Sequence, residues 1–237
     1  MKVWQENQLQ ALMANQSEHQ LFQTICGLSK ELGFDYCAYG LRMPLPLMTP
    51  KVFMLNNYPE EWRRQYQANN YLAIDPTVQH ATRSLLPIIW TDDLFDRTRE
   101  LWEDAHSFGL RFGWAQSIRD FNGVVSMLTL ARSTEPISEL ELNAKRIEIA
   151  WLTQMVHEGM SKCLEVSQMM PEVSAGLSKR EIEVLKWTAI GKTSGEVSSI
   201  LNIAERTVNF HINNTIAKLN VTNKTAAAVK AAILGLL

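Results

Sequence analysis

In the first two thirds of the chain, segments with strand-like hydrophobic patterns alternate with segments whose apolar residues have helical spacing. Five short segments are rich in aromatic and β-branched residues and predict strands, at 34–43, 51–55, 87–90, 113–120 and 124–132. Around them, apolar residues recur with helical spacing. Helices are therefore predicted at 17–33, 59–68, 75–84, 98–108 and 136–162. Helices before and after a set of strands favour an α/β/α sandwich with an antiparallel sheet.

The ends of the first helix carry typical signals. Ser17 with Gln20 forms a capping-box pattern, and Gly33 is a common C-terminal stop. The long helix at 136–162 is amphipathic. Its apolar side contains Leu140, Ile147, Trp151, Met155 and Val156.

The pattern becomes purely helical after residue 176. Residues 165–176, EVSQMMPEVSAG, have weak periodicity, one proline and a final glycine. We therefore predict an α/β domain at 1–165, a linker at 166–176 and an all-α domain at 177–237. The predicted helices of the second domain lie at 179–190, 193–201, 205–219 and 223–237, with a turn at 202–204. Ser178 and Glu181 form a capping box before the first of them.

A short helix, a three-residue turn and a longer helix form a helix-turn-helix pattern. One side of the longer helix is apolar and should pack on the domain's own core: Val208, Ile212, Ile216 and Leu219. The opposite side presents Arg206, Phe210, Asn213 and Asn214. Arginine can pair with guanine, asparagine with adenine, and a phenylalanine edge can contact a thymine methyl group.

Phosphate contacts are predicted at helix starts. Lys192 and Thr193 open the short helix, and Lys224 opens the last one. From Leu177 onward the chain has eight basic and four acidic residues, a net charge of +4, while the remainder has 15 basic and 21 acidic residues, a net charge of −6. This asymmetry favours a polyanionic partner for the second domain alone. The alternative is an ordinary four-helix domain with solvated charges.

The composition limits the class of protein and its cellular location. The chain has 237 residues, 46% of them apolar, and no run of eighteen apolar residues that could span a membrane. It begins without a signal-peptide core. Its three cysteines are far apart and form no CxxC pair, so neither a disulfide scaffold nor a zinc site is expected. These features predict a cytoplasmic protein without a cofactor.

Residues 177–224 resemble the LuxR/GerE-type DNA-binding domain over its whole length. The residues that carry the resemblance are Glu181, Leu185, Gly191, Glu196, Thr207, Val208, His211, Lys218, Leu219 and Asn223. The resemblance implies binding to double-stranded DNA and adds Thr207 and Lys218 to the expected contacts. Asn209 departs from the pattern, because lysine is common at this position.

The first domain contains an unusual aromatic stripe. Tyr58, Trp62 and Tyr66 recur every four residues and share one side of a helix, and Asp75-Pro76 follows. Core packing explains the aromatics, and a helix cap with proline at the first helical position explains Asp75. A pocket that holds a small polar headgroup explains both. The carboxylate can fill both roles, since it has two oxygens.

Tyr58, Trp62, Asp75, Trp90 and the pair Gly109…Gly113 resemble the autoinducer-binding domain of LuxR-type quorum-sensing regulators. That resemblance implies an acyl-homoserine lactone as the ligand. Trp62 then donates to the lactone carbonyl, Asp75 accepts from the amide N–H, and Trp90 packs on the lactone ring. Tyr58 and Ser126 would donate to the amide carbonyl.

Further contacts follow from the same resemblance. The expected acyl-chain contacts are Tyr66, Val78, Leu110, Phe112 and Met127. Arg63 could reach a 3-oxo group through water. The alternative is an ordinary core position for the five acyl-chain residues and a simply exposed position for Arg63, and such positions are the more common ones for these residue types.

Together, these features predict a ligand-gated transcription regulator. Its expected partners are an acyl-homoserine lactone, double-stranded DNA, a second copy of the chain and RNA polymerase. An enzyme is disfavoured, because the sequence has no GxSxG elbow and no HxxH or HxE metal motif. The remaining alternative is a DNA-binding regulator whose first domain only dimerises or binds a signal other than a lactone.

Overall fold

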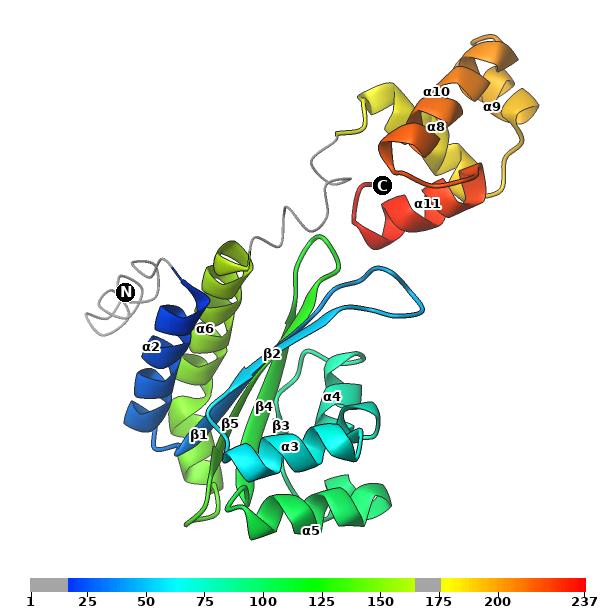
Figure 1. Cartoon of the computed structure of the whole chain (residues 1–237). Coiled ribbons are helices and arrows are strands. Elements are labelled where there is room, and N and C mark those ends of the chain that lie inside the picture. The colour runs from blue at the N-terminus through cyan, green and yellow to red at the C-terminus, as the bar shows by residue number, and fades with distance from the viewer. Residues whose placement is uncertain (1–16, 165–175) are drawn as a thin grey trace. The chain divides into compact units, whose positions relative to one another are not determined.

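The computed structural model describes residues 17–164 and 176–237. Its helices and strands form two compact units, with α6 ending the first and α8 opening the second (Figure 1). The predicted linker at 166–176 lies outside the described residues, except for Gly176. None of the helices in the described ranges is long and apolar enough to cross a bilayer.

The first unit is built on a five-stranded antiparallel sheet. The strands are β1 (Tyr36–Arg42), β2 (Val52–Asn56), β3 (Ile88–Ile89), β4 (Phe112–Arg119) and β5 (Val125–Arg132), in the order β2-β1-β5-β4-β3. All neighbours pair in the antiparallel sense. The predicted sandwich with an antiparallel sheet is confirmed.

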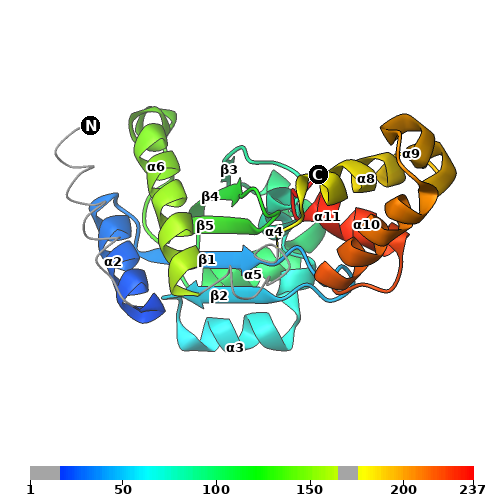
Figure 2. The same cartoon turned by 90° about the horizontal axis from the view of Figure 1, so that it is seen from above.

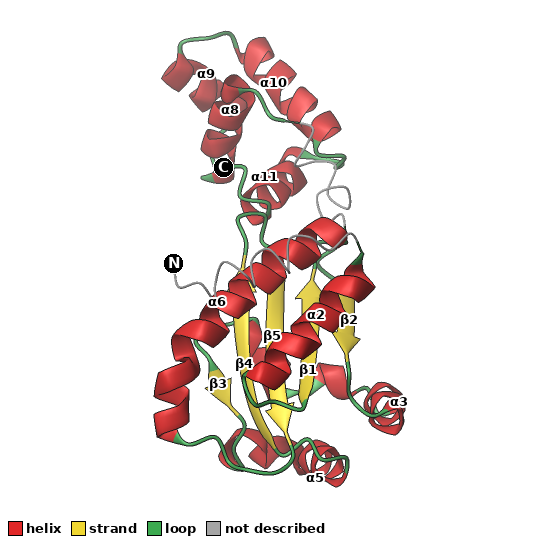
Figure 3. Ribbon diagram, turned by 90° about the vertical axis from the view of Figure 1, so that its left-hand side faces the viewer, coloured by secondary structure: helices red, strands yellow, loops and turns green. Residues whose placement is uncertain are grey.

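Helices cover both faces of this sheet. On one face lie α2 (Glu18–Glu31) and α6 (Glu139–Cys163), as Figure 3 shows most clearly. On the other lie α3 (Glu60–Ala68), α4 (Pro76–Ala81) and α5 (Arg99–Ser107), with the 3₁₀ turns η1 (Tyr71–Ala73) and η2 (Asp93–Thr98) (Figure 2). We call these the α2–α6 face and the α3–α5 face. The two 3₁₀ turns were not predicted.

The central strand β5 is buried on both faces. Successive side chains of a strand point to opposite faces. Ala131 belongs to the same apolar cluster as Trp62 and therefore points to the α3–α5 face. Thr129 and Met127 share that face, whereas Ser126 points to the α2–α6 face.

The buried side of α6 differs from the predicted one. Of the five apolar residues expected to share a side, Leu140 and Ile147 are 85% and 74% exposed, and only Val156 is fully buried. The side that packs on the sheet contains Ile149, Leu152, Thr153, Val156, His157 and Met160. The apolar periodicity therefore predicted the helix, but it did not predict which side of the helix is buried.

A buried ion pair fixes the start of α6. The Arg132 guanidinium donates to both carboxylate oxygens of Glu141, at 2.8 and 2.7 Å, and also to the carbonyl oxygens of Glu135 and Pro136. Hydrogen bonds from Arg132, supported by Lys145, lower the pKa of Glu141 to about 2. The stabilisation from this carboxylate is therefore present above its unfolded-state pKa and is lost as the pH falls towards 2.

The second unit has the predicted four helices: α8 (Lys179–Ala189), α9 (Ser194–Leu201), α10 (Glu205–Lys218) and α11 (Lys224–Ile233). The Ser178–Glu181 capping box is present. Val208, Ile212 and Leu219 are buried, as expected for the inner side of α10. Asn202 has a positive φ of 51°, which permits the tight turn between α9 and α10.

Removing the Arg132 side-chain charge should destabilise the first unit. Arg132→Met leaves Glu141 with Lys145 as its remaining partner in a largely buried position, so we expect the free energy of unfolding to fall by about 3 kcal/mol. Arg99→Met is the control, because its ion pair with Asp96 is exposed and should contribute under about 1 kcal/mol. Denaturant unfolding of the two variants measures the difference. Equal losses would contradict the assigned role of Arg132.

Candidate functional site

An aromatic cluster forms where α3 and η1 cover the sheet. Trp62 is 3% exposed, and its ring centroid lies 5.6 Å from that of Tyr66, 6.0 Å from that of Tyr71 and 5.8 Å from that of Phe108. Tyr58, just before α3, packs against the same cluster. The three aromatic residues of the predicted stripe thus pack in one cluster, but Tyr58 precedes α3 and does not lie on the helix. Among the described residues, nothing accepts a hydrogen bond from Trp62 Nε1, so this donor is available to a ligand.

Asp75 fills two roles with its two oxygens. Oδ1 caps α4, accepting from the Thr77 backbone N–H at 2.8 Å and from the Thr77 hydroxyl at 2.6 Å. Oδ2 accepts from the Tyr66 hydroxyl at 2.9 Å. Burial raises the pKa of Asp75, although these hydrogen bonds act in the opposite direction. The capping role is thus present, and Oδ2 retains acceptor capacity for a further donor.

Tyr66 therefore differs from its predicted place along an acyl chain. Its hydroxyl binds the Asp75 carboxylate, and its ring packs edge-on against Trp62, with an interplanar angle of 68°. We assign Tyr66 to the polar end of the site. Burial, followed by the neighbouring Asp75 charge, raises the pKa of Tyr66, so the phenol keeps its proton and remains a donor.

Trp90 lies directly over a glycine of β4. A β-carbon at Gly113 would come within 2.2 Å of the Trp90 ring, so this position admits only glycine. Phe95 and Trp102 surround the indole, with centroids 6.2 and 6.3 Å away. The buried Trp90 Nε1 has no hydrogen-bond partner among the described residues. A buried donor without a partner is costly, and a ligand acceptor would satisfy it.

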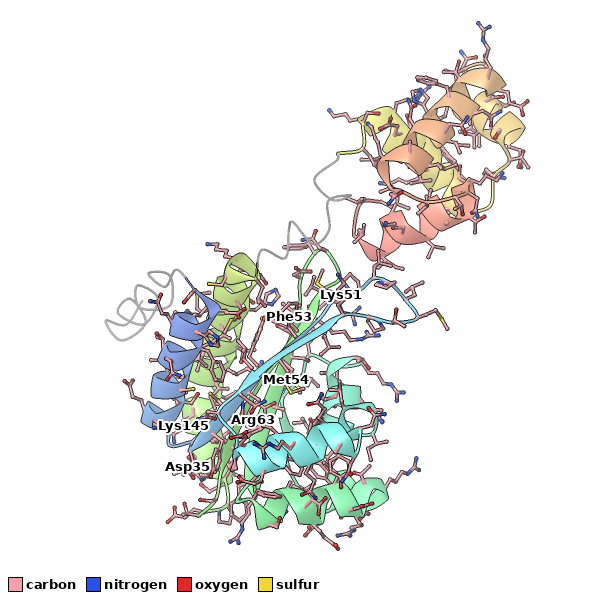
Figure 4. The ribbon with its side chains drawn as sticks, in the orientation of Figure 1. Asp35, Lys51, Phe53, Met54, Arg63 and Lys145 are labelled. Atoms are coloured by element: carbon pink, nitrogen blue, oxygen red, sulfur yellow. The ribbon has the colours of Figure 1, made fainter. Side chains whose placement is uncertain are left out.

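Small residues form the floor of the site on the α3–α5 face. The strand register places Ala38 and Ala115 on either side of Thr129, and Gly40 beside Met127. Gly40 has no conformational need to be glycine, and a β-carbon there would meet only a backbone oxygen at 4.0 Å. A glycine inside a strand often marks the close approach of a ligand. On the other side of Gly40, the neighbouring residue on β2 is Met54 (Figure 4).

Ser126 is not part of this floor, and its predicted ligand role is wrong. It is 2% exposed on the α2–α6 face, where its hydroxyl lies 2.9 Å from Nδ1 of His157 on α6. Phe112 is likewise misplaced, because it alternates with Gly113 and so points away from Trp90. Thr129 is the hydroxyl residue that faces the aromatic cluster, and it forms no hydrogen bond with any described residue.

The other predicted contacts are distributed unevenly. Leu110 is 1% exposed inside the aromatic cluster, and Met127 and Val78 are half-buried. Arg63 is exposed on α3 (Figure 4) and has no ion pair with a described residue. Its predicted contact with a 3-oxo group stays a prediction. Within the described ranges, no group of three His, Cys, Asp or Glu side chains could hold a metal ion.

Three contributors were missed from the sequence. Tyr71 and Trp102 belong to the cluster, and Asp104 on α5 accepts a hydrogen bond from the Tyr71 hydroxyl. Tyr71 lies in a 3₁₀ turn that sequence periodicity does not reveal. The aromatic and apolar spacing of 98–108 could have indicated Trp102, since it fixes which side of α5 is buried.

The second unit presents the expected face on α10. Arg206 and Asn213 are exposed, Phe210 is 60% exposed, and Asn214 and Thr207 are half-buried. Lys224 is exposed at the first position of α11. These positions fit the predicted base and phosphate contacts, which stay predictions.

Three other predicted DNA contacts already form hydrogen bonds or ion pairs within the second unit. Lys218 is paired with Glu181 at 2.8 Å, so a DNA phosphate would compete with this carboxylate for it, and the predicted DNA contact stays a prediction. Burial alone would raise the pKa of Glu181, but hydrogen bonds from Lys218 and Ser178 lower it. Thr193 caps α9 through Glu196, and Lys192 pairs with Glu196 at 3.2 Å. A phosphate at this helix start would therefore compete with the Glu196 carboxylate for Lys192.

Comparison with known proteins matches both units. The family described as "Autoinducer binding domain" matches residues 17–160, and "Bacterial regulatory proteins, luxR family" matches residues 175–231. The chain belongs to the LuxR family. Both resemblances seen in the sequence are thereby confirmed, and the protein is an autoinducer-binding transcription regulator.

LuxR-family relatives cover the full chain. It is 46% identical to the transcriptional activator protein AnoR of Acinetobacter nosocomialis, covering 100% of both chains. It is 37% identical to the regulatory protein SdiA of Escherichia coli, covering 99% of this chain and 97% of SdiA. A crystal structure of SdiA matches with a TM-score of 0.81 at 36% identity, over 98% of this chain and 97% of that one.

The two faces of β5 give a matched pair of variants. Thr129→Val removes a hydroxyl on the α3–α5 face at nearly constant shape and should weaken autoinducer binding about tenfold. Ser126→Ala removes a hydroxyl from the same strand on the α2–α6 face and should leave the affinity unchanged. Ligand titration followed by thermal shift measures both. A loss in Ser126→Ala alone would mean that the strand is assigned to the wrong face.

Proposed function

We propose that the protein binds an acyl-homoserine lactone between the α3–α5 face and its helices, and binds an inverted-repeat operator as a dimer. One observation carries the ligand assignment: two indole donors and, through Tyr66, a carboxylate acceptor border the same aromatic cluster. Trp62 and Trp90 supply unpartnered N–H groups, and Asp75 supplies a carboxylate oxygen. An amide N–H next to carbonyl groups complements this set.

The chemistry assigns a hydrogen-bond partner to each polar group except the Trp90 N–H, because the Trp90 ring packs on the lactone. Asp75 Oδ2 accepts from the ligand amide N–H, a charge-assisted bond. Trp62 Nε1 donates to the lactone carbonyl, and Tyr58 and Thr129 donate to the amide carbonyl. The acyl chain then runs over Ala38 and Gly40, where the strands offer little side-chain volume. A crystallised relative, CepR2 of Burkholderia cenocepacia, is described as N-acylhomoserine lactone dependent; it is 31% identical over 67% of this chain, with a TM-score of 0.62.

Ligand binding is coupled to regulation through the folded state. A ligand that binds only the folded protein stabilises it by about 4 kcal/mol at a thousandfold excess over Kd. The exposed Leu140 and Ile147 on α6 favour a second copy as the partner of that helix. A dimer would present two helix-turn-helix units to half-sites about 34 Å apart. The regulator acts at DNA in the cytoplasm and contacts RNA polymerase there.

A second ligand class has its own support. SdiA has been crystallised in complex with octanoyl-rac-glycerol, in a structure that matches this chain with a TM-score of 0.80 at 36% identity. An acylglycerol lacks the amide N–H, but its hydroxyl groups can donate to Asp75 Oδ2. A signal other than a lactone therefore remains the alternative for this site.

Ligand identity is tested by expression with a panel of acyl-homoserine lactones and octanoyl-glycerol, followed by mass spectrometry of what co-purifies. We expect one lactone per chain. Asp75→Asn should lose the lactone, because the charged acceptor contributes about 1.5–3 kcal/mol. Glu61→Gln is the control, since Glu61 is exposed on α3 and this change also removes one carboxylate charge, so it should not affect retention. Retention of lactone by Asp75→Asn would leave Asp75 with its capping role alone.

The DNA face makes a separate prediction. Arg206→Ala or Asn213→Ala should cost about 1–3 kcal/mol on the operator and relax its sequence preference, because these side chains reach base edges. Lys192→Ala should weaken binding to all sequences and reduce the salt dependence. Gel-shift titrations on operator and scrambled duplexes at two salt concentrations separate these outcomes. A change of sequence preference in Lys192→Ala but not in Arg206→Ala would show that α10 is wrongly oriented.

A further inference from the structure

Tyr71 connects the two residues that hold the ligand headgroup. Its ring lies 6.0 Å from that of Trp62, centroid to centroid. Its backbone carbonyl accepts from the Asp75 backbone N–H at 2.8 Å. Trp62 lies on α3 and Asp75 immediately before α4, so Tyr71 sets the position of one relative to the other.

An acidic residue on α5 holds Tyr71 in place. The Tyr71 hydroxyl donates to Asp104 Oδ2 at 2.5 Å and accepts from the Asn69 side-chain amide at 3.0 Å. The same Asp104 oxygen accepts from the side-chain amide of Gln65 on α3. Asp104 thus joins α5 to both α3 and η1 through one carboxylate oxygen.

The hydrogen bonds to Asp104 are strong enough to fix the positions of the side chains that form them. Hydrogen bonds to an ionised carboxylate are stronger than neutral ones. Tyr71 is 2% exposed and Asp104 is half-buried, so water competes weakly for the bonds. A ligand bonded at once by Trp62 and Asp75 needs both groups at a fixed separation, and small displacements weaken both bonds.

We propose that Asp104 is a positioning residue for ligand recognition, which fixes Trp62 and Asp75 relative to each other by holding Tyr71 and Gln65. Asp104 does not touch the ligand in this account. The inference rests on the proposed lactone site and adds a residue to it from a helix that supplies no headgroup contact. It also explains why the polar side of α5 points a carboxylate towards α3.

The test compares three single variants in cells that carry a reporter gene under the protein's operator and are dosed with the acyl-homoserine lactone that co-purifies with the wild-type protein. Asp104→Asn keeps the shape of the side chain but loses its charge, and Tyr71→Phe keeps the ring but loses the hydroxyl. Both should raise the lactone concentration for half-maximal response about tenfold. Glu103→Gln, an exposed neighbour on α5, is the matched control and should not change it. Immunoblotting at saturating lactone measures how much folded protein accumulates.

Coupling to Trp62 separates positioning from simple destabilisation. In a Trp62→Phe background the lactone carbonyl has already lost its donor, so Asp104→Asn should raise the half-maximal concentration much less than tenfold. A full tenfold effect in that background, or none in the wild type, overturns the positioning role. If Asp104→Asn fails to accumulate, Tyr71→Phe in the same two backgrounds decides between these results. If no acyl-homoserine lactone changes reporter expression with the wild-type protein, the proposed function is overturned, and this inference with it.

Discussion

The first unit depends on the burial of strand β5 on both faces. Every residue of β5 except Met127 is buried, so each face needs its own cover. α2 and α6 pack closely on one face with large apolar side chains. On the other, Ala38 and Gly40 give the sheet little side-chain volume beneath α3, α4 and α5, whereas the Trp90 ring covers Gly113. The low side-chain volume at Ala38 and Gly40 supports the proposed placement of the acyl chain, because it lets an apolar chain approach the sheet closely.

The polar end of the site follows from a second constraint, which is that a buried carboxylate must be hydrogen-bonded. Asp75 meets it with two different partners, Thr77 for one oxygen and Tyr66 for the other. The helix cap orients the carboxylate before any ligand arrives. The Tyr66 hydroxyl keeps it compatible with burial, so the same geometry serves both the fold and the recognition of a donor.

Local signals in the sequence predicted most of the fold and part of the site. Alternation and turn residues located every strand, and the capping-box patterns located the starts of α2 and α8. Ser126 was misassigned because its role came from a resemblance, while the face of a strand depends on register with its neighbours. Leu140 and Ile147 form a good apolar stripe, yet α6 buries a different side. Asp104 and Tyr71 interact across 33 positions, and no local pattern reports such a pair.

The most direct test of this account is a crystal structure of the full chain with a bound acyl-homoserine lactone. We expect the ligand amide nitrogen within hydrogen-bond distance of Asp75 Oδ2, the lactone ring against Trp90, and the acyl chain over Ala38 and Gly40. The hydroxyl of Thr129, and not that of Ser126, should face the ligand. A lactone bound on the α2–α6 face beside His157, or bound without contact to Asp75, would contradict the account.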